Sequence, residues 1–152
     1  MAERIAIASD HAAVELKSAL VEHLRGAGFE VSDLGPATTD SFDYPAYGYK
    51  LPEAMPSGPA DKGVALCGSG IGISIAVNRN PACRCARVSE PLSAALARQH
   101  NDANVIAMGA RLVGPEMAKA CVDAFFGTAF LGDRHQRRVD QLSNPASSKE
   151  PA

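Results

Sequence analysis

The chain has 152 residues, of which 46% are hydrophobic and 21% charged, a composition typical of one ordinary globular domain. Its net charge of −2 argues against a general nucleic-acid binder, and no apolar run approaches the ~18–20 residues that span a bilayer. Residues Met1–Arg4 lead directly into a strand and lack the pattern of a secretory signal, so we expect a cytoplasmic protein without nucleic-acid or membrane partners.

Short β-like runs alternate with longer helical patterns along the chain. In chain order, the sequence predicts a strand at Arg4–Ser9, a helix at Ala12–Arg25, a strand at Phe29–Asp33, a loop at Leu34–Tyr44, a helix at Ala46–Met55 that Pro52 breaks or ends early, a strand at Lys62–Cys67, a helix at Ile71–Arg79, a short strand at Arg84–Val88, a helix at Glu90–His100, a strand at Asn104–Met108, and helices at Pro115–Phe126 and Asp133–Leu142. Residues 1–143 are expected to form a single domain, and the polar segment 144–152 a disordered, frayed tail.

Five strands interleaved with helices indicate an α/β fold, in which helices cover both faces of a parallel sheet. Ligands of such folds bind beyond the carboxyl ends of the strands. The candidate residues are expected to gather at that edge: Asp10 and His11 after the first strand, Cys67 at the end of the third, Arg111 after the fifth, and His100 and Asn101 at the end of the helix before the fifth.

The four cysteines are expected to be reduced thiols in a cytoplasmic protein. Cys83 and Cys85 form a C-x-C pair with no second pair or nearby histidine, so the sequence predicts no zinc site. Cys121 lies in an apolar helical pattern, which favours a place in the core.

Cys67 has a setting of a different kind, because a glycine-rich turn, Gly68-Ser69-Gly70-Ile71-Gly72, and a predicted helix follow it directly. Free backbone N–H groups and the positive end of a helix dipole stabilise a thiolate or an oxyanion on a bound ligand. The turn matches neither the P-loop pattern nor the dinucleotide fingerprint, and it is also compatible with a simple tight turn. The preceding cysteine favours chemistry over that reading.

The other candidates also have plain structural interpretations. Asp10 caps the helix that begins near Ala12, a role compatible with one in a site. His100 lies at a polar helix end, where a positive charge is favourable. Arg134 and Arg138, four residues apart on one helical face, suit a phosphate dianion as well as a solvated basic surface.

Together these parts indicate an enzyme that acts on a sugar phosphate. The arginines would hold the phosphate, and a histidine would handle a hydroxyl proton. The thiolate would remove a carbon-bound proton beside a carbonyl, and the N–H groups of the glycine turn would stabilise the enediolate. Such a reaction requires no metal and no cofactor.

At these residues the chain resembles the ribose-5-phosphate isomerase type B family, which includes galactose-6-phosphate and allose-6-phosphate isomerases. The resemblance runs from about Arg4 to Leu142. The motifs that carry it are Ser9-Asp10-His11-Ala12, Asp43-Tyr44-Pro45, Cys67-Gly68-Ser69-Gly70-Ile71-Gly72, Ser89-Glu90-Pro91, Arg98-Gln99-His100-Asn101-Asp102, Gly109-Ala110-Arg111 and Arg134-His135-Gln136-Arg137-Arg138.

The resemblance implies interconversion of ribose 5-phosphate and ribulose 5-phosphate through a cis-enediolate, a reaction of the pentose phosphate pathway. Cys67 matches the base that moves a proton between C1 and C2, Ser69 matches a position often held by threonine that moves a proton between the two oxygens, and His100 matches the ring-opening residue. The remaining matches are Asp10 and Tyr44 in the sugar pocket, Asn101, Gly68, Gly70 and Gly72 around the enediolate, and His11, Arg111, Arg134 and Arg138 at the phosphate.

The family fold is a three-layer Rossmann-like sandwich. The resemblance further implies a homodimer or dimer of dimers, with the site between two subunits and the C-terminal helix packed on the partner. One branch of the family replaces the cysteine by a glutamate at the start of the following helix; Ser74 stands there in this chain, which indicates the cysteine branch. Two alternatives remain: an isomerase of a tetrose or hexose phosphate, and a non-catalytic phosphate sensor.

Overall fold

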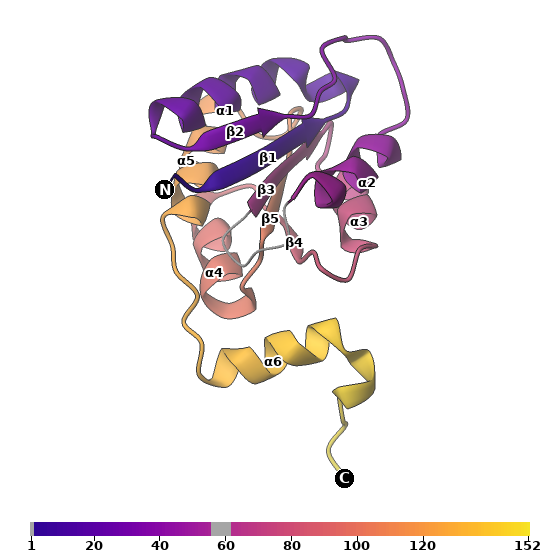
Figure 1. Ribbon diagram of the computed structural model, residues 1–152, viewed down its shortest axis with the longest axis vertical. Helices are drawn as coiled ribbons and strands as arrows, with labels where there is room; N and C mark the ends of the chain where they lie inside the picture. Colours follow the sequence, from indigo (N-terminus) through magenta and orange to yellow (C-terminus); the bar gives the residue numbers. More distant parts are fainter. Residues whose placement is uncertain (1, 56–61) are drawn as a thin grey trace.

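The computed structural model describes residues 2–55 and 62–152 and contains one five-stranded sheet (Figure 1). Its strands are β1 (Arg4–Ser9), β2 (Glu30–Asp33), β3 (Lys62–Cys67), β4 (Cys85–Arg87) and β5 (Val105–Gly109), in the spatial order β2-β1-β3-β5-β4. Every neighbouring pair is parallel. The predicted α/β fold is therefore confirmed, and each strand begins and ends within one residue of its predicted range.

Helices cover both faces of this sheet (Figure 1). One face carries α1 (Val14–Gly26), α4 (Pro91–Asn101) and α5 (Pro115–Phe126), and the other carries α2 (Pro45–Ala54) and α3 (Ile71–Asn78). Pro52 lies inside the last turn of α2, which ends two residues later at Ala54, and it lacks the N–H that would donate to the carbonyl of Gly48. Within the described ranges, no helix combines the length and apolar character needed to cross a bilayer.

The alternation of side chains along β1 divides the core into two layers. Ile5 and Ile7 pack on the side of α1, α4 and α5, whereas Ala6 and Ala8 pack on the side of α2 and α3. Cys121 is fully buried in the first of these layers, which confirms its predicted place in the core.

Helix α4 buries two alanines and an arginine rather than its leucines. Its buried face consists of Ala94, Ala97 and Arg98. Leu92 and Leu96, which the sequence places together on one helical face, are 67% and 37% exposed. The close packing of α4 against α5 favours alanine at the contact, and the leucines are left on the surface of the single chain.

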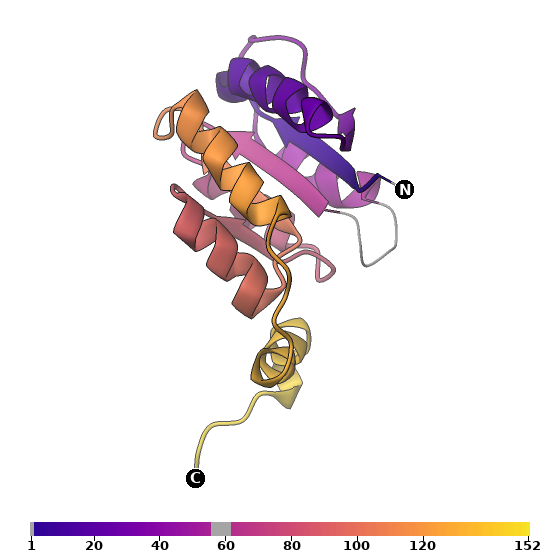
Figure 2. The same cartoon turned by 90° about the vertical axis from the view of Figure 1, so that its left-hand side faces the viewer.

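Helix α6 (Arg134–Ser143) lies apart from the three-layer sandwich and contacts α4 at the lower end of the molecule (Figures 1 and 2). It buries only His135 and Val139, which are four residues apart and share one face. The segment predicted to fray contains one short 3-10 turn, Pro145–Ser147, and all of its residues are exposed.

The order of the strands defines where a ligand can bind. Strands β1 and β3 are neighbours, but the chain runs from β1 to β2 on one side and from β3 to β4 at the opposite edge of the sheet. Where successive connections diverge in this way, the carboxyl ends of the two strands flank a crevice. In this chain that crevice lies between Asp10 and Cys67.

Candidate active site

A cavity of about 370 Å³ opens at the carboxyl edge of the sheet, between the ends of β1, β3 and β5. It is lined by Asp10, His11, Ala12, Tyr44, Cys67, Gly68, Ser69, Gly72, Arg111 and Leu112. Most of the site residues predicted from the sequence therefore come together in one chain, because parallel strands deliver their carboxyl ends to the same edge.

Cys67 ends β3 and is 4% exposed. Its Sγ accepts a hydrogen bond from the backbone N–H of Gly70 at 3.1 Å. Helix α3 begins at the next residue, Ile71, so the positive end of its dipole also points toward the sulfur. An N–H donor and a helix N-terminus both stabilise the thiolate, the form of cysteine that can take up a proton.

The glycine loop fits against the end of β5 through backbone contacts. Gly70 has a φ of 76°, and a Cβ there would lie 2.6 Å from the carbonyl carbon of Met108. A Cβ on Gly109 would lie 2.5 Å from the carbonyl carbon of Ser69. Glycine is required at both positions because the opposing atoms belong to backbone, which cannot rotate away.

We expect Gly109→Ala to displace the loop, to lower the free energy of unfolding by ~1–3 kcal/mol and to reduce turnover strongly. Gly114→Ala is the matched control, since a Cβ at Gly114 meets nothing within 4 Å and its φ is −70°. Urea unfolding and steady-state kinetics of both variants measure the effect. Equal behaviour of the two variants would contradict the tight fit of the loop.

Asp10 and His11 are held in place by backbone groups. The Asp10 carboxylate is 7% exposed and accepts the N–H of Ala12 at 2.9 Å, which confirms the predicted cap. The Nδ1 of His11 lies 3.3 Å from the N–H of Phe42, which donates to it. The neutral His11 ring must then carry its proton on Nε2, so it presents a donor to a ligand.

The loop that carries Phe42 and Tyr44 begins at an ion pair between a buried lysine and an exposed aspartate. Lys17, 3% exposed, donates from Nζ to Asp33 at 2.6 Å, and the N–H of Gly35 donates to the same carboxylate oxygen at 2.9 Å. Burial by itself would raise the pKa of Asp33, but these two hydrogen bonds and the positive charges of Lys17 and Arg25 together outweigh it, and the pKa lies below its usual value. The carboxylate is thus charged at neutral pH and anchors the start of the loop.

The outer wall of the cavity combines an aromatic ring and a guanidinium. Tyr44 is 40% exposed, and a Cβ on Gly72 would lie 2.5 Å from its ring, so glycine gives the tyrosine room beside the loop. Arg111 donates its backbone N–H to the carbonyl of Gly68 at 3.0 Å, and its side chain runs alongside that glycine. Arg111 and His11 together place two donors for an anion at this cavity.

His100, Asn101, Arg134 and Arg138 do not lie at this cavity within one chain. Helix α4 has 11 residues and returns antiparallel to the strands, so His100 and Asn101 at its end lie about 16 Å along the sheet from its carboxyl edge. Asn104, three residues after Asn101, accepts the N–H of Gly63 at the start of β3 and exchanges hydrogen bonds with Arg84, just before β4. The expectation that all candidates gather at the carboxyl edge is therefore wrong for a single chain.

The end of α4 is rigidly held. Asp102 has a φ of 45° in the left-handed region, and its carboxylate pairs with Arg98 at 2.8 Å. Arg84 donates to the carbonyls of both Asn101 and Asp102 at 3.1 Å. His100 stacks on His135 of α6 with ring centroids 4.5 Å apart and an interplanar angle of 11°. Arg134 and Arg138 are exposed on the same helix.

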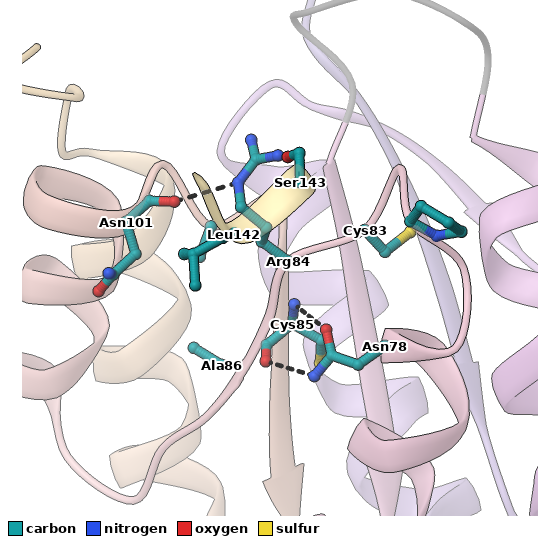
Figure 3. A pocket seen from close by; sticks show the side chains of 10 residues that line it. Asn78, Cys83, Arg84, Cys85, Ala86, Asn101, Leu142 and Ser143 are labelled. Carbon is teal, nitrogen blue, oxygen red and sulfur yellow. Dashed lines mark hydrogen bonds between the residues drawn. The ribbon is translucent and has the colours of Figure 1, made fainter. Parts of the chain in front are cut away.

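A groove of about 400 Å³ lies beside this second group of residues, between the start of β4 and the end of α6 (Figure 3). Asn101 and Leu142 line one part of it and Cys83 and Cys85 another. Burial raises the pKa of the Cys83 and Cys85 thiols, so both are protonated at neutral pH. The two thiols therefore add no charge to the part of the groove that they line.

Three further residues lie at the cavity, the glycine loop and the end of α4, and the sequence motifs did not point to a role for them. Leu112 lines the cavity, and Arg87 at the end of β4 donates from Nε to the carbonyl of Ser69 at 3.1 Å, on the peptide whose N–H points to Cys67. His135 packs under His100. Of these three residues, only His135 could have been found from the sequence. It lies four residues before Val139, a spacing that predicts one buried face on a polar helix.

Comparison with known proteins agrees with this geometry. The family model described as Ribose/Galactose Isomerase matches residues 5–142. Ribose-5-phosphate isomerase B of Escherichia coli (strain K12) is 45% identical over 141 residues, covering 93% of this chain and 95% of that protein.

Two solved structures are similar as well. The ribose-5-phosphate isomerase B of Clostridium thermocellum has a TM-score of 0.90 and 40% identity, covering 94% of this chain and 97% of the other. That of Mycoplasma genitalium with bound ribulose-5-phosphate has a TM-score of 0.90 and 36% identity, with coverages of 96% and 97%. The family match over residues 5–142 and the 45% identity over 93% of the chain show that the chain belongs to the ribose/galactose isomerase family.

Proposed function

We propose that the protein interconverts ribose 5-phosphate and ribulose 5-phosphate in the pentose phosphate pathway, with Cys67 as the base. The observation that carries this proposal is the Cys67 sulfur, which ends β3 in the cavity and accepts the N–H of Gly70. The similarity to a solved family member that holds ribulose-5-phosphate supports the choice of a pentose phosphate.

The reaction divides among the groups at the carboxyl edge. The Cys67 thiolate removes the proton from C2 of the open-chain aldose, and the electron pair forms the C1–C2 double bond of a cis-enediolate with its charge on O1. Backbone N–H groups of the glycine loop stabilise this charge, while that of Gly70 remains on the Cys67 sulfur. The Ser69 hydroxyl passes a proton from O2 to O1, and the Cys67 thiol returns its proton to C1, which yields the ketose.

The ends of the sugar phosphate fit the remaining groups. His11 and Arg111 bind the phosphate from this subunit, and Asp10 and Tyr44 contact the sugar hydroxyls. The open-chain aldose must first form from its furanose ring, which requires transfer of the C1 hydroxyl proton to the ring oxygen. His100 performs that transfer, since a neutral imidazole can take up and return a proton near neutral pH.

His100, Asn101, Arg134 and Arg138 reach the cavity from a second subunit in this proposal. Their separation from Cys67 within one chain supports a homodimer in which each site combines the carboxyl edge of one subunit with the α4 and α6 ends of the other. A two-fold axis makes two such sites at once, since each subunit offers both surfaces.

Two apolar surfaces suit this dimer contact. Ile71 and Ile75 are 51% and 60% exposed on α3, directly beside the glycine loop. The groove beside Asn101 presents Leu142, which is 60% exposed (Figure 3). Docking of the α3 face into the partner's groove would bury these side chains and bring Asn101 toward the partner's cavity.

A coupled assay with purified protein tests the substrate. We expect kcat/KM to be highest for ribose 5-phosphate when four-, five- and six-carbon aldose phosphates are compared, because the family similarity points to the pentose. A higher kcat/KM for a tetrose or hexose phosphate would keep the mechanism and reject the pentose. No turnover of any of them would reject catalysis in favour of a phosphate sensor.

A further inference from the structure

His135 is packed face to face with the proposed ring-opening residue. Its ring centroid lies 4.5 Å from that of His100, the two planes differ by 11°, and His135 is 7% exposed. Helix α6 has only two buried side chains, His135 and Val139, so a large share of the contact that holds it against α4 is this stack. The mechanism above assigns His135 no role.

The surroundings of His135 disfavour a charge on it. Burial lowers its pKa, and the neighbouring His100, Arg134 and Arg138 lower it further, whereas Asp133 opposes them. On α4, the other charged groups near this end are paired with each other, Arg98 with Asp102 at 2.8 Å. The adjacent 3-10 turn, Pro145–Ser147, carries no titratable side chain. His135 is therefore neutral at pH 7.

We propose that His135 is a positioning residue that fixes the ring of His100 and offers its neutral face to the imidazolium that forms there during ring opening. This inference rests on the proposed role of His100. A protonated imidazole over the face of a neutral aromatic ring is attracted to it, as other cations are. A flat ring at position 135 also holds the His100 ring in one orientation before the substrate binds, so less rotational freedom is lost when His100 meets the substrate.

Only one of the two substrates has a ring that must be opened before it can isomerise. Ribose 5-phosphate closes into a furanose through its C4 hydroxyl, so the C1–O4 bond must break and the C1 hydroxyl proton must pass to O4. Ribulose 5-phosphate has its carbonyl at C2 and would need a free C5 hydroxyl to close a five-membered ring, but that oxygen carries the phosphate. The ketose therefore enters the site already open.

The test compares His135→Ala, His135→Phe and the control Arg137→Ala in both directions, with initial rates from ribose 5-phosphate and from ribulose 5-phosphate. We expect His135→Ala to lower kcat about tenfold with ribose 5-phosphate and much less with ribulose 5-phosphate, because the open-chain aldose formed from the ketose can leave the site and close in solution. The equilibrium constant fixes the ratio of kcat/KM in the two directions, so kcat/KM should fall by the same factor in both. Phenylalanine keeps the flat ring, so His135→Phe should recover most of the loss. Arg137 is exposed on α6 and should be replaceable without effect.

The outcomes separate this inference from the function on which it rests. Wild-type kinetics in His135→Ala, or equal losses of kcat in both directions with no rescue by phenylalanine, would overturn the positioning role and leave the isomerase intact. A wild-type protein without turnover would overturn both. Light scattering on each variant shows whether the subunits stay assembled. A loss of activity that comes from dissociation would also overturn the inference.

Discussion

Replacing Cys67 by alanine is expected to lower kcat for ribose 5-phosphate by about 10³-fold, the range in which removal of a general base falls. The thiol lies at the cavity and accepts the Gly70 N–H, and no other side chain lining the cavity combines these two properties. His11 and Arg111, the proposed phosphate ligands, remain in place at the cavity. Binding of ribose 5-phosphate, measured by calorimetry, should therefore change less than threefold in affinity while turnover is lost.

Cys121→Ala is the matched control for this experiment. Cys121 is also a buried thiol, at 0% exposure, but it packs in the apolar layer under α5, away from the cavity. Its replacement removes the same sulfur atom and should cost about 1 kcal/mol of stability with unchanged kcat at 25 °C. If Cys67→Ala keeps wild-type turnover, or loses no more than Cys121→Ala, Cys67 does not act as the base.

The sequence was sufficient for the fold because its local signals agree with one another. Apolar runs such as Lys62–Cys67 end at glycines, and helix signals such as Pro115 follow at regular spacing, so the α/β order could be predicted. The inward face of α4 could not. Leucines normally indicate the buried face of a helix, yet Leu92 and Leu96 are exposed on α4. The buried face is decided by the close packing of α4 against α5, a neighbour that the local sequence of α4 does not reveal.

One part of the site could be placed from the strand ends alone. The other part could be placed only by knowing the direction of helix α4. Asp10 and Cys67 end or follow parallel strands, which places them at one edge without further information. His100 lies at the end of a helix that runs antiparallel to the strands, so it lies near the amino ends of the strands rather than their carboxyl ends. Sequence motifs record which residues belong to a site, whereas they do not record which copy of the chain supplies them.

Mixing two inactive variants tests whether one site combines Cys67 of one subunit with His100 of another. Cys67→Ala and His100→Ala are each purified, confirmed to have little turnover, dissociated together and reassembled. Random pairing makes half of the dimers mixed, and each mixed dimer holds one site with both residues intact, so activity should recover to about one quarter of wild type.

The control is each variant taken through the same dissociation and reassembly alone, which should stay inactive. Native mass spectrometry of differently tagged variants verifies that mixed dimers have formed. Recovery of about one quarter of the wild-type kcat/KM in the mixture is the result that the shared site predicts. A mixture that contains mixed dimers and remains as inactive as its components would contradict it, since both residues would then have to act within one chain.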